Sequence, residues 1–519
     1  MTQVNRLDGG LIDRTTPLDF TFDGRRYGGF AGDTLASALL ANGVRLVGRS
    51  FKYHRPRGII SAGSEEPNAL VELREGARRE PNSRATVTEL HDGLVARSQN
   101  RFPSLGFDLL AINDQFSAFL GAGFYYKTFM WPKSFWERVY EPIIRRAAGL
   151  GALSGDPDPD VYDRGFRHCD LLVIGAGPAG LMAALTAGRA GAEVILVDED
   201  FRAGGRLTME RETIAGASGG DWAANVAGEL ATMPNVRVMP RSTAIGVFDH
   251  GIYSVLEHVS DHLAVPREGT PRQILWRVYA KRAILAAGAT ERLIAFENND
   301  RPGIMQAGAV RAYVNRWATA PAERIAIFTN NDDGHRTAAD LAAAGLDIAA
   351  IIDSRPDAPA SDVAELYAGA VVSNSSGRHG IGHVSLRFAD GGTRNIACGA
   401  LAVSGGWNPN VHLTCHHRGR PQWRQDIAAF VPGDGVPPGL AVAGAARRLC
   451  GAAPGGVPFA VWAVGREQGG AAIRPARSWP LAPPRADAPA AAAHGQRRGR
   501  RPRGRRRGRR RRRTARSAP

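Results

Sequence analysis

The stretch from residue 171 to residue 198 constrains the fold of this chain more than any other. It reads LLVIGAGPAGLMAALTAGRAGAEVILVD, in which an apolar run precedes a G-x-G-x-x-G turn, a helical segment and a second apolar run. An acid follows the second run, 18 residues after the last glycine of the turn. This order predicts a βαβ unit that binds a dinucleotide.

Each residue of the turn has a physical role in such a site. Gly175 makes the tight turn out of the first strand, Gly177 lets the backbone approach a pyrophosphate, and Gly180 packs the helix against the strand. The helix begins at Pro178, and its free N–H groups and positive dipole end face the phosphates. We therefore expect the phosphates of the nucleotide at this turn.

The acid after the second strand selects the kind of nucleotide. The Asp198 carboxylate can accept hydrogen bonds from a ribose diol, and its charge would repel a 2′-phosphate. NAD or FAD is therefore expected rather than NADP. Downstream, Gly204-Gly205 lets the chain pass close to the nucleotide, and Arg206 could reach its phosphates, although a surface arginine is the plainer interpretation.

Three further segments are expected at the same site. Thr243-Ala244-Ile245 is where this class of fold often places backbone against an adenine, and the turn around Gly288 is typical of two-dinucleotide flavoproteins. In those flavoproteins the strand corresponding to residues 439–446 usually ends in Gly-Asp, with the acid facing FAD. Here Gly444 is followed by Ala445, which weakens the FAD interpretation and leaves NAD as the better fit.

Residues 324–354 imitate a second βαβ unit. An apolar strand, Ile325–Phe328, is followed by TNNDDGHRTAADLAAAGLD and by a second strand that ends at Asp353. The glycines of a working phosphate turn are absent, and Asp332 and Asp333 occupy that turn, where they would repel a pyrophosphate. We expect residues 322–400 to be a degenerate Rossmann half without a nucleotide.

The first part of the chain, residues 1–104, predicts a small α+β domain. Its expected elements include a strand at Leu18–Phe22, a turn at Asp23-Gly24, a helix through Ala41 capped by Asp33 or Thr34, and strands at 69–73, 85–90 and 94–96. It resembles the ferredoxin-like domains of some amine-oxidising flavoprotein complexes. Residues 1–167 hold no cysteine, and a [2Fe–2S] cluster needs thiolates, so we expect the fold without the cluster.

Residues 105–165 are expected to form an aromatic-rich helical connection that ends in a polar linker at 154–165. Dense aromatic residues of this kind are more often core or subunit interface than a ligand cage. The nucleotide-binding domain is then expected at 166–446 and an Arg/Ala/Pro-rich disordered tail at 447–519. The aromatic residues fall within 17 positions: Phe124, Tyr125, Tyr126, Phe129, Trp131, Phe135, Trp136 and Tyr140.

Composition excludes several classes of protein. The net charge of +16 arises from the tail, which holds 20 arginines and two acids, so the rest of the chain is near neutral and does not suggest a nucleic-acid binder. No run of 18 apolar residues and no apolar signal segment are present, so no membrane association is expected. Four widely spaced cysteines fit neither a disulfide framework nor a metal site, and they suit the cytoplasm.

Several motifs together resemble the alpha subunit of heterotetrameric sarcosine oxidase over about residues 18–446. They are GDTLASALLANGV, SFKYHRPRGIISAGSEEPNALVEL, GFYYKTFMWP, the GAGPAG unit, ATERLIAFENNDRPGIM and SGGWNPNVHL. The resemblance implies an α/β fold of the Rossmann-like, two-dinucleotide-binding FAD/NAD(P) type. A cluster-less, ferredoxin-like α+β domain precedes it.

The resemblance also implies a function. In that family NAD is bound by the alpha subunit, the FAD that oxidises sarcosine is held by a beta subunit, FMN lies at their interface, and gamma and delta subunits complete the heterotetramer. Sarcosine and O2 give glycine and H2O2, with the methyl carbon leaving as formaldehyde or passing to tetrahydrofolate. By position, Ala179, Asp198, Glu199 and Arg206 would contact NAD, with Ala244 at the adenine. None is a catalytic acid, base or nucleophile, so the chemistry belongs to flavins.

One departure from the family is large. Its alpha subunits are about twice as long, with a folate-binding second half, whereas the resemblance here stops near Ala446. The Arg-Gly-Ala-Pro bias that follows is what a shifted reading frame of GC-rich DNA gives, so we hypothesise a frameshifted or truncated subunit. The alternative is a genuine basic tail that binds nucleic acid or anionic surfaces.

Other functions compete with this one. A related subunit of an opine oxidase or a cyanide-forming glycine dehydrogenase is the nearest, but the missing N-terminal cysteines and SFKYHRPRG favour sarcosine oxidase. A self-sufficient disulfide reductase would need a redox C-x-x-C, which this sequence lacks. A non-enzymatic RNA- or surface-binding protein would depend on the tail alone.

Overall fold

A computed structural model gives the fold, and it describes residues 3–121, 123, 131–149 and 151–447. The tail predicted at 447–519 lies outside the described residues from position 448 onward. Four aromatic residues of the predicted connection also lie outside them: Phe124, Tyr125, Tyr126 and Phe129.

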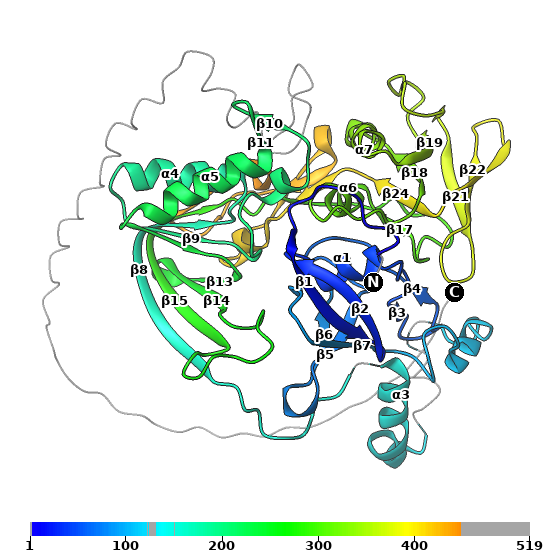
Figure 1. Ribbon diagram of the computed structural model, residues 1–519, viewed down its shortest axis with the longest axis horizontal. Coiled ribbons are helices and arrows are strands. Elements are labelled where there is room, and N and C mark those ends of the chain that lie inside the picture. Colours follow the sequence, from blue (N-terminus) through cyan, green and yellow to red (C-terminus); the bar gives the residue numbers. More distant parts are fainter. Residues whose placement is uncertain (1–2, 122, 124–130, 150, 448–519) are drawn as a thin grey trace, which may run out of the picture. The chain divides into compact units, whose positions relative to one another are not determined.

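The N-terminal segment forms a sheet with a helix packed on it (Figure 1), in the order β2-β1-β7-β5-β6. The predicted Asp23-Gly24 turn is confirmed, because both residues have positive φ (49° and 77°) and join the first two strands as a two-residue hairpin turn. Thr34 caps the helix through a capping box with Ser37. The elements are β1 (Asp13–Phe22), β2 (Arg25–Ala31), α1 (Leu35–Ala41), β3 (Gly48–Arg49), β4 (Pro56–Arg57), β5 (Leu70–Leu73), β6 (Glu80–Arg84) and β7 (Leu94–Ser98).

One predicted strand of this segment is wrong. Residues 85–90 were expected to be extended, but the strand is β6, which ends at Arg84, and a turn follows it. The backbone there serves the start of α1 instead, since Leu35 N donates to Thr88 O and Ala36 N donates to Ala85 O. The sequence ATVTEL alternates apolar and polar residues as a strand does, although here the segment packs against the start of α1.

The described residues of the connection that follows include short helical turns and the helix α3; they are η2 (Leu109–Asp114), η3 (Lys133–Phe135), η4 (Trp136–Tyr140) and α3 (Glu141–Ala148). The polar linker is shorter than predicted, because the next strand, β8, already begins at Tyr162. The run YDRGFRHC has no strand-like alternation, yet it is held extended along its whole length by a parallel partner, β15.

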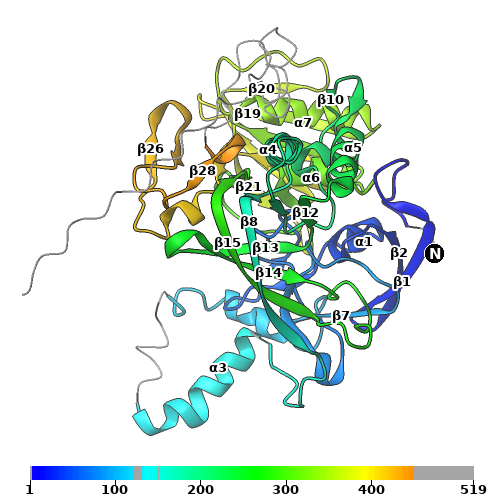
Figure 2. The same cartoon turned by 90° about the vertical axis from the view of Figure 1, so that its left-hand side faces the viewer.

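The main sheet has the order β12-β9-β8-β15-β14-β13, with β28 also paired to β15. β8 and β15 run side by side over twelve paired positions (Figure 2), and β9 and β12 continue the parallel part. The strands are β8 (Tyr162–Ile174), β9 (Val194–Val197), β12 (Val236–Met239), β13 (Ser242–Phe248), β14 (Ile252–His258), β15 (Gln273–Leu285) and β28 (Leu440–Val442).

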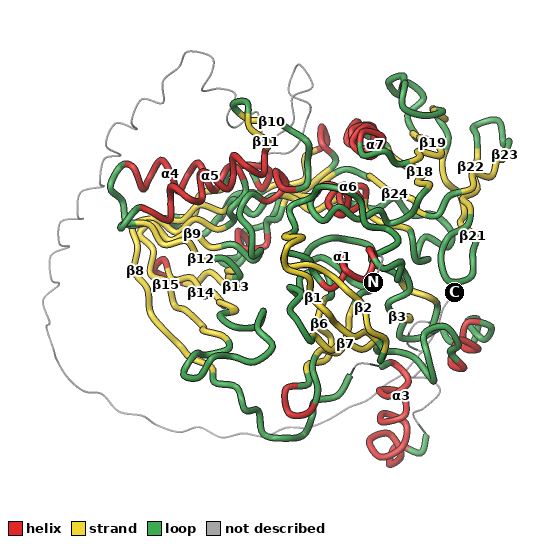
Figure 3. Tube along the Cα trace, viewed as in Figure 1, coloured by secondary structure: helices red, strands yellow, loops and turns green. Residues whose placement is uncertain are grey.

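Two helices cover one face of this sheet, α4 (Pro178–Arg189) and α5 (Gly219–Thr232), as Figure 3 shows. Their apolar side chains, among them Leu181 and Leu230, form one core with Leu196 of β9. The antiparallel strands β13, β14 and β15 form a β-meander. On the opposite face, Leu172 packs with Val255 of this meander in a second core. The short ribbon β10 (Thr213–Ile214) and β11 (Ala217–Ser218) precedes α5.

A second parallel sheet, of order β17-β24-β18-β19-β20, forms the predicted second Rossmann half. Its elements are β17 (Ile304–Gln306), α6 (Ala307–Asn315), β18 (Arg324–Thr329), α7 (Asp332–Ala343), β19 (Asp347–Asp353), β20 (Leu366–Ala368) and β24 (Ala400–Ser404). The sheet β21 (Val371–Ser376), β22 (His383–Arg387) and β23 (Thr393–Ala397) packs on it. Two ribbons complete the fold: β16 (Ala289–Glu291) with β25 (Trp407–Pro409), and β26 (Gln422–Arg424) with β27 (Ala429–Val431).

The ferredoxin-like segment shares a core with this second half. Leu39 of α1 and Tyr313 of α6 belong to one buried cluster, which also holds Trp317. The Trp317 ring nitrogen donates to Gly32 O at 3.0 Å, and the Arg6 guanidinium binds both Asp33 and the Trp317 carbonyl. The predicted fold class is confirmed, and its two parts are packed together rather than tethered.

Candidate dinucleotide site

The phosphate turn has the geometry that its glycines predict. Gly175 has φ +104°, and a Cβ there would lie 2.5 Å from the Ala286 carbonyl oxygen. At Gly180 a Cβ would lie 1.8 Å from the Gly175 oxygen, so the helix packs directly on the turn. A Cβ at Gly177 would meet nothing within 4 Å. The first and last glycines are therefore required by packing, whereas the middle one faces open space.

The start of α4 is free to bind an anion. Its N-cap is Gly177, which offers no side-chain hydrogen bond, and Pro178 occupies the first helical position. Ala179 and Gly180 stand in the first turn, where backbone N–H groups lack partners within a helix. An uncapped N-terminus beside open space is the arrangement that binds a pyrophosphate.

Asp198 ties the two strands of the unit together at this turn. One carboxylate oxygen accepts the Ala176 N–H at 2.5 Å and the other accepts the Asp200 N–H at 2.8 Å. Burial raises the pKa of Asp198 to about 7, the neighbouring acids Asp200 and Glu199 add to this, and the two N–H groups oppose it. Each oxygen retains a further lone pair, so the carboxylate can still accept from a ribose hydroxyl. Glu199 is exposed and accepts the Ser64 hydroxyl at 2.8 Å.

The Gly204-Gly205 turn lies against the phosphate turn. Gly204 N donates to Ala176 O at 2.8 Å, and a Cβ on Gly205 would lie 3.2 Å from Gly177 Cα. The Gly204-Gly205 backbone therefore lies beside Gly177, the residue that caps the start of α4. The next side chain, Arg206, extends toward residues of the second Rossmann half.

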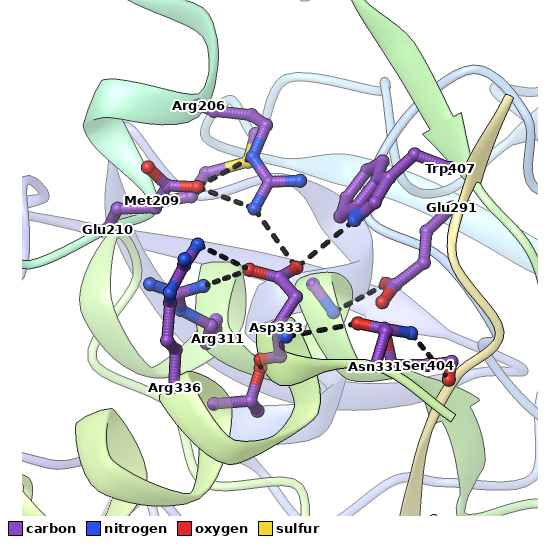
Figure 4. A network of polar contacts seen from close by, with 12 residues as sticks. Arg206, Met209, Glu210, Glu291, Arg311, Asn331, Asp333, Arg336, Ser404 and Trp407 are labelled. Carbon is purple, nitrogen blue, oxygen red and sulfur yellow. Dashed lines mark hydrogen bonds and ion pairs between the residues drawn. The ribbon is translucent and has the colours of Figure 1, made fainter. Parts of the chain in front are cut away.

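Arg206 belongs to a polar network between the two halves (Figure 4). Its guanidinium lies 3.8 Å from the centre of the Trp407 ring, its Nε donates to Glu210 at 2.6 Å, and a terminal nitrogen lies 3.4 Å from Asp333. Burial alone would lower the pKa of Arg206, but Glu210, Asp333 and Glu291 raise it. The side chain is therefore held by protein groups, and its predicted contact with the nucleotide stays a prediction.

A buried acid of this network that the sequence did not single out is Glu291. It is 5% exposed, one oxygen accepts the Gly308 N–H at 2.6 Å, and Oε1 has no hydrogen bond of normal geometry within the described part of the chain. Burial raises its pKa to about 8, and Asp333 contributes. The only signal in the sequence was an acid directly after the turn at Gly288.

The other expected residues lie at the carboxyl ends of neighbouring strands or on the meander. Gly288 has φ +69° and accepts the Asn410 N–H at 3.1 Å. Gly444 and Ala445 form a short turn, η9 (Gly444–Ala446), that contacts α4. Ala244 lies on β13 at a bulge, beside an exposed Ile245 (51%). Gly444 and Ala445 thus lie against the helix that begins at the phosphate turn. Ala244 lies on β13, two residues after Ser242, whose N–H donates to Asp198 O at 2.7 Å.

No grouping of three or more His, Cys, Asp or Glu residues suited to a metal ion occurs among the described positions. Within the same positions, none of the helices combines the length and apolar character needed to cross a membrane.

Comparison with known proteins identifies both parts of the chain. Residues 15–101 match a family described as a 2Fe-2S iron-sulfur cluster binding domain, and residues 170–250 match one described as FAD dependent oxidoreductase. L-proline dehydrogenase from P. horikoshii has a similar fold, with a TM-score of 0.57 and 19% identity over 86% of this chain and 71% of that chain. This likeness concerns the fold alone.

The sarcosine oxidase alpha chain of Rhizobium meliloti is 54% identical over 446 residues, which are 86% of this chain and 45% of that protein. An opine oxidase subunit of Agrobacterium tumefaciens is 29% identical over 36% of this chain and 37% of its own length. The chain spans under half the length of the sarcosine oxidase subunits that it matches. The expected family is therefore confirmed: over the matched residues, this chain is a relative of the sarcosine oxidase alpha subunits.

Proposed function

We propose that this chain binds NAD and supports a sarcosine oxidase complex without supplying a catalytic group. The observation that carries the proposal is the uncapped start of α4 beside Gly177, where a Cβ would meet nothing within 4 Å. The residues therefore fit a dinucleotide: the first-turn N–H groups hold the pyrophosphate, Asp198 and Glu199 lie at the ribose, and Ala244 lies at the adenine. When bound, such a nucleotide supplies hydride-transfer chemistry.

The choice between NAD and FAD is part of the proposal. The matching oxidoreductase family covers residues 170–250, and the βαβ unit inside that range serves either nucleotide. Ala445 follows Gly444 in the turn that contacts α4, where a flavoprotein of this class would carry an acid. This departure supports NAD at the first site and leaves FAD and FMN to the complex.

The complex itself is proposed from the relatives. An oxidoreductase acting on the CH–NH bond of sarcosine, with oxygen as acceptor, would place FMN between the subunits and FAD on a beta subunit. Gamma and delta subunits would complete it, and the products would be glycine, H2O2 and formaldehyde or methylene-tetrahydrofolate. The domain boundaries predicted at 1–104, 105–165 and 166–446 remain part of this proposal, except that the nucleotide-binding domain begins with β8 at Tyr162.

Exposed apolar side chains support a role as a subunit. Large exposed apolar residues gather in the segment between the ferredoxin-like sheet and β8, and such patches mark interaction sites. They include Phe102 (57%), Phe107 (62%), Ile112 (54%), Phe119 (81%), Trp131 (84%) and Ile143 (63%).

An opine oxidase subunit is the second candidate function. It is favoured only by the weaker match, which covers about a third of this chain. Oxidation of an opine rather than sarcosine by the assembled complex would select it.

The test is to purify the full chain alone and with its presumed beta partner, denature each sample and identify the released nucleotides by chromatography. Gly177→Ala serves as the matched control. NAD released from the lone wild-type chain but not from the variant, with flavin only in the presence of the partner, is the expected result. Stoichiometric FAD from the lone chain, or no binding of added NAD, would overturn the proposal.

A further inference from the structure

The loop between β4 and β5 is organised around one buried carboxylate. Glu66 is 1% exposed, and its Oε2 accepts the N–H groups of Ile60 at 2.9 Å and Ser61 at 2.7 Å. Its Oε1 accepts those of Asn68 at 2.8 Å and Ala69 at 3.0 Å. The Ser61 hydroxyl also lies 3.2 Å from Oε2. One carboxylate thus joins the two ends of the loop.

Converging backbone N–H groups form an anion-binding concavity, the kind that also surrounds many iron–sulfur clusters. In such clusters, hydrogen bonds to the sulfurs help set the properties of the centre. Here the anion inside the concavity is the Glu66 carboxylate, a side chain of the protein itself. Because hydrogen bonds to a carboxylate are stronger than those between neutral groups, four of them at Glu66 favour this conformation of the loop.

The spacing of the buried residues in this loop matches a cluster motif. Plant-type [2Fe–2S] domains bind the cluster with C-x4-C-x2-C and one distant cysteine. Ser61, Glu66 and Ala69 stand at that spacing, are 0%, 1% and 0% exposed, and lie within the range that matches the cluster-binding family. Ala85 is the candidate for the distant position, since it is fully buried and its N–H donates to Ala69 O at 2.9 Å.

These residues do not fit an iron–sulfur cluster, because none of them offers a thiolate. We propose that Glu66 occupies the second ligand position of the cluster motif and that its carboxylate replaces the cluster as the anion that orders the loop. Ser61, Ala69 and Ala85 occupy the other ligand positions. The segment therefore keeps the loop conformation of a redox domain while carrying no redox centre of its own.

The ordered loop has a second task, which is to hold the ferredoxin-like segment against the nucleotide domain. The buried Tyr313 hydroxyl of α6 donates to Ser61 O at 2.9 Å, and Gln306 N donates to Ile60 O at 2.9 Å. Farther along, the Ser64 hydroxyl donates to Glu199 beside the expected ribose site. The Glu66 carboxylate is the positioning group for these contacts.

A single pair of variants tests the role of the carboxylate. Glu66→Gln keeps the shape but replaces one acceptor oxygen with a donor, so two of the four N–H groups lose their partner. We expect hydrogen exchange in residues 59–70 to rise about 10-fold or more. Glu65→Gln, in the same loop but outside this set of N–H contacts, is the control and should leave it unchanged. Equal exchange in wild type and Glu66→Gln would overturn the proposal.

Restoring the ligands tests the assigned positions. The full chain carrying Ser61→Cys, Glu66→Cys, Ala69→Cys and Ala85→Cys should bind about two iron ions after anaerobic reconstitution with ferrous iron and sulfide, with the absorption and reduced-state EPR signal of a [2Fe–2S] centre. In the control, Ser64→Cys replaces Ser61→Cys, which breaks the spacing, and it should stay without a cluster. Equal loading of the control, or an iron-free quadruple variant that melts like wild type, would refute the assignment. If the quadruple variant does not fold, the exchange experiment decides alone.

Discussion

Two glycines of the phosphate turn should respond in opposite ways to the same added methyl group. At Gly177 the backbone has φ −70° and ψ 179°, which alanine adopts freely, and a Cβ would meet nothing within 4 Å. Replacing glycine with alanine stabilises the folded state by about 0.4–1 kcal/mol, because the unfolded chain loses conformational freedom. Alanine is a poor residue at a helix N-cap, which offsets this stabilisation. We expect Gly177→Ala to change the free energy of unfolding by less than about 1 kcal/mol.

Nucleotide binding by the same variant should fall sharply. The methyl group would stand where the pyrophosphate approaches the backbone, and losing one hydrogen bond to a charged group costs about 1.5–3 kcal/mol. That loss corresponds to roughly 10- to 150-fold in Kd, measured by titration calorimetry of the full chain with NAD and with FAD. Unchanged affinity for both nucleotides would refute the assignment of the pyrophosphate to this turn.

Gly180→Ala is the contrasting change. Its Cβ would lie 1.8 Å from the Gly175 carbonyl oxygen, and a backbone atom cannot rotate away as a side chain can. Overpacking costs about 1–3 kcal/mol and occasionally more, so this overlap should fall at or above the upper end. Urea unfolding of wild type and both variants measures the difference. A Gly180→Ala chain as stable as wild type would show that the helix does not pack on the turn as described.

Three other outcomes follow from single contacts. Burial raises the pKa of Glu291 from 4.5 to about 8, so the folded chain holds this proton more tightly and should lose stability as the pH rises between those values. Glu291→Gln should remove this pH dependence. The melting temperature of the variant relative to wild type should therefore rise up to about pH 8 and then stay constant. Thr34→Ala, which breaks the capping box with Ser37, should cost about 0.5–2 kcal/mol in urea unfolding. Arg206→Lys should lose both the stacking on Trp407 and the fork of donors, and its chevron plot should show faster unfolding.

The local features of the fold could be predicted from the sequence. The βαβ unit, the Asp23-Gly24 hairpin and the Thr34 cap each depend on residues within one turn or one strand, and each is confirmed. Strand β8 begins earlier than the apolar run that predicts it, because its first half, YDRGFRHC, is largely polar and is held extended by its distant partner β15. Pairing with a strand more than a hundred residues away leaves no periodic signal in this segment.

The candidate site divides in the same way. Gly180 could be placed because its packing partner, Gly175, is a neighbour in sequence, whereas the contact of Gly175 with the distant Ala286 could not be foreseen. The surroundings of Arg206 and Glu291 could not be, since Asp333 and Trp407 reach them from the second half. Side chains whose environment is built by distant segments are the ones whose role the sequence leaves open.

The glycine motif serves two purposes, which are packing of the helix on the turn and approach of a pyrophosphate to the backbone. The second Rossmann half keeps the glycine for the first purpose and lacks the glycine for the second. Its turn runs from Thr329 to Gly334 in the register of Gly175 to Gly180, and a Cβ on Gly334 would lie 2.4 Å from the Thr329 side chain. The last glycine is thus retained, in contrast to the prediction that the glycines of this turn are absent. At the middle position stands Asn331, whose side chain accepts the Asp333 N–H at 3.0 Å.

That capping bond occupies a backbone N–H group of the first turn of α7, which a bound phosphate would need. The acid at the end of β19, which in a working site would bind a ribose, is also occupied by protein groups. Asp353 accepts from Arg355 and from the His335 ring at 2.9 Å. The second half, which we expect to bind no nucleotide, therefore still uses the last glycine for helix packing but not the middle one. A nucleotide in the first half is accordingly indicated by Gly177 and the uncapped helix that it begins. We expect a chain that kept Gly180 but not Gly177 to fold in the same way and to bind no nucleotide.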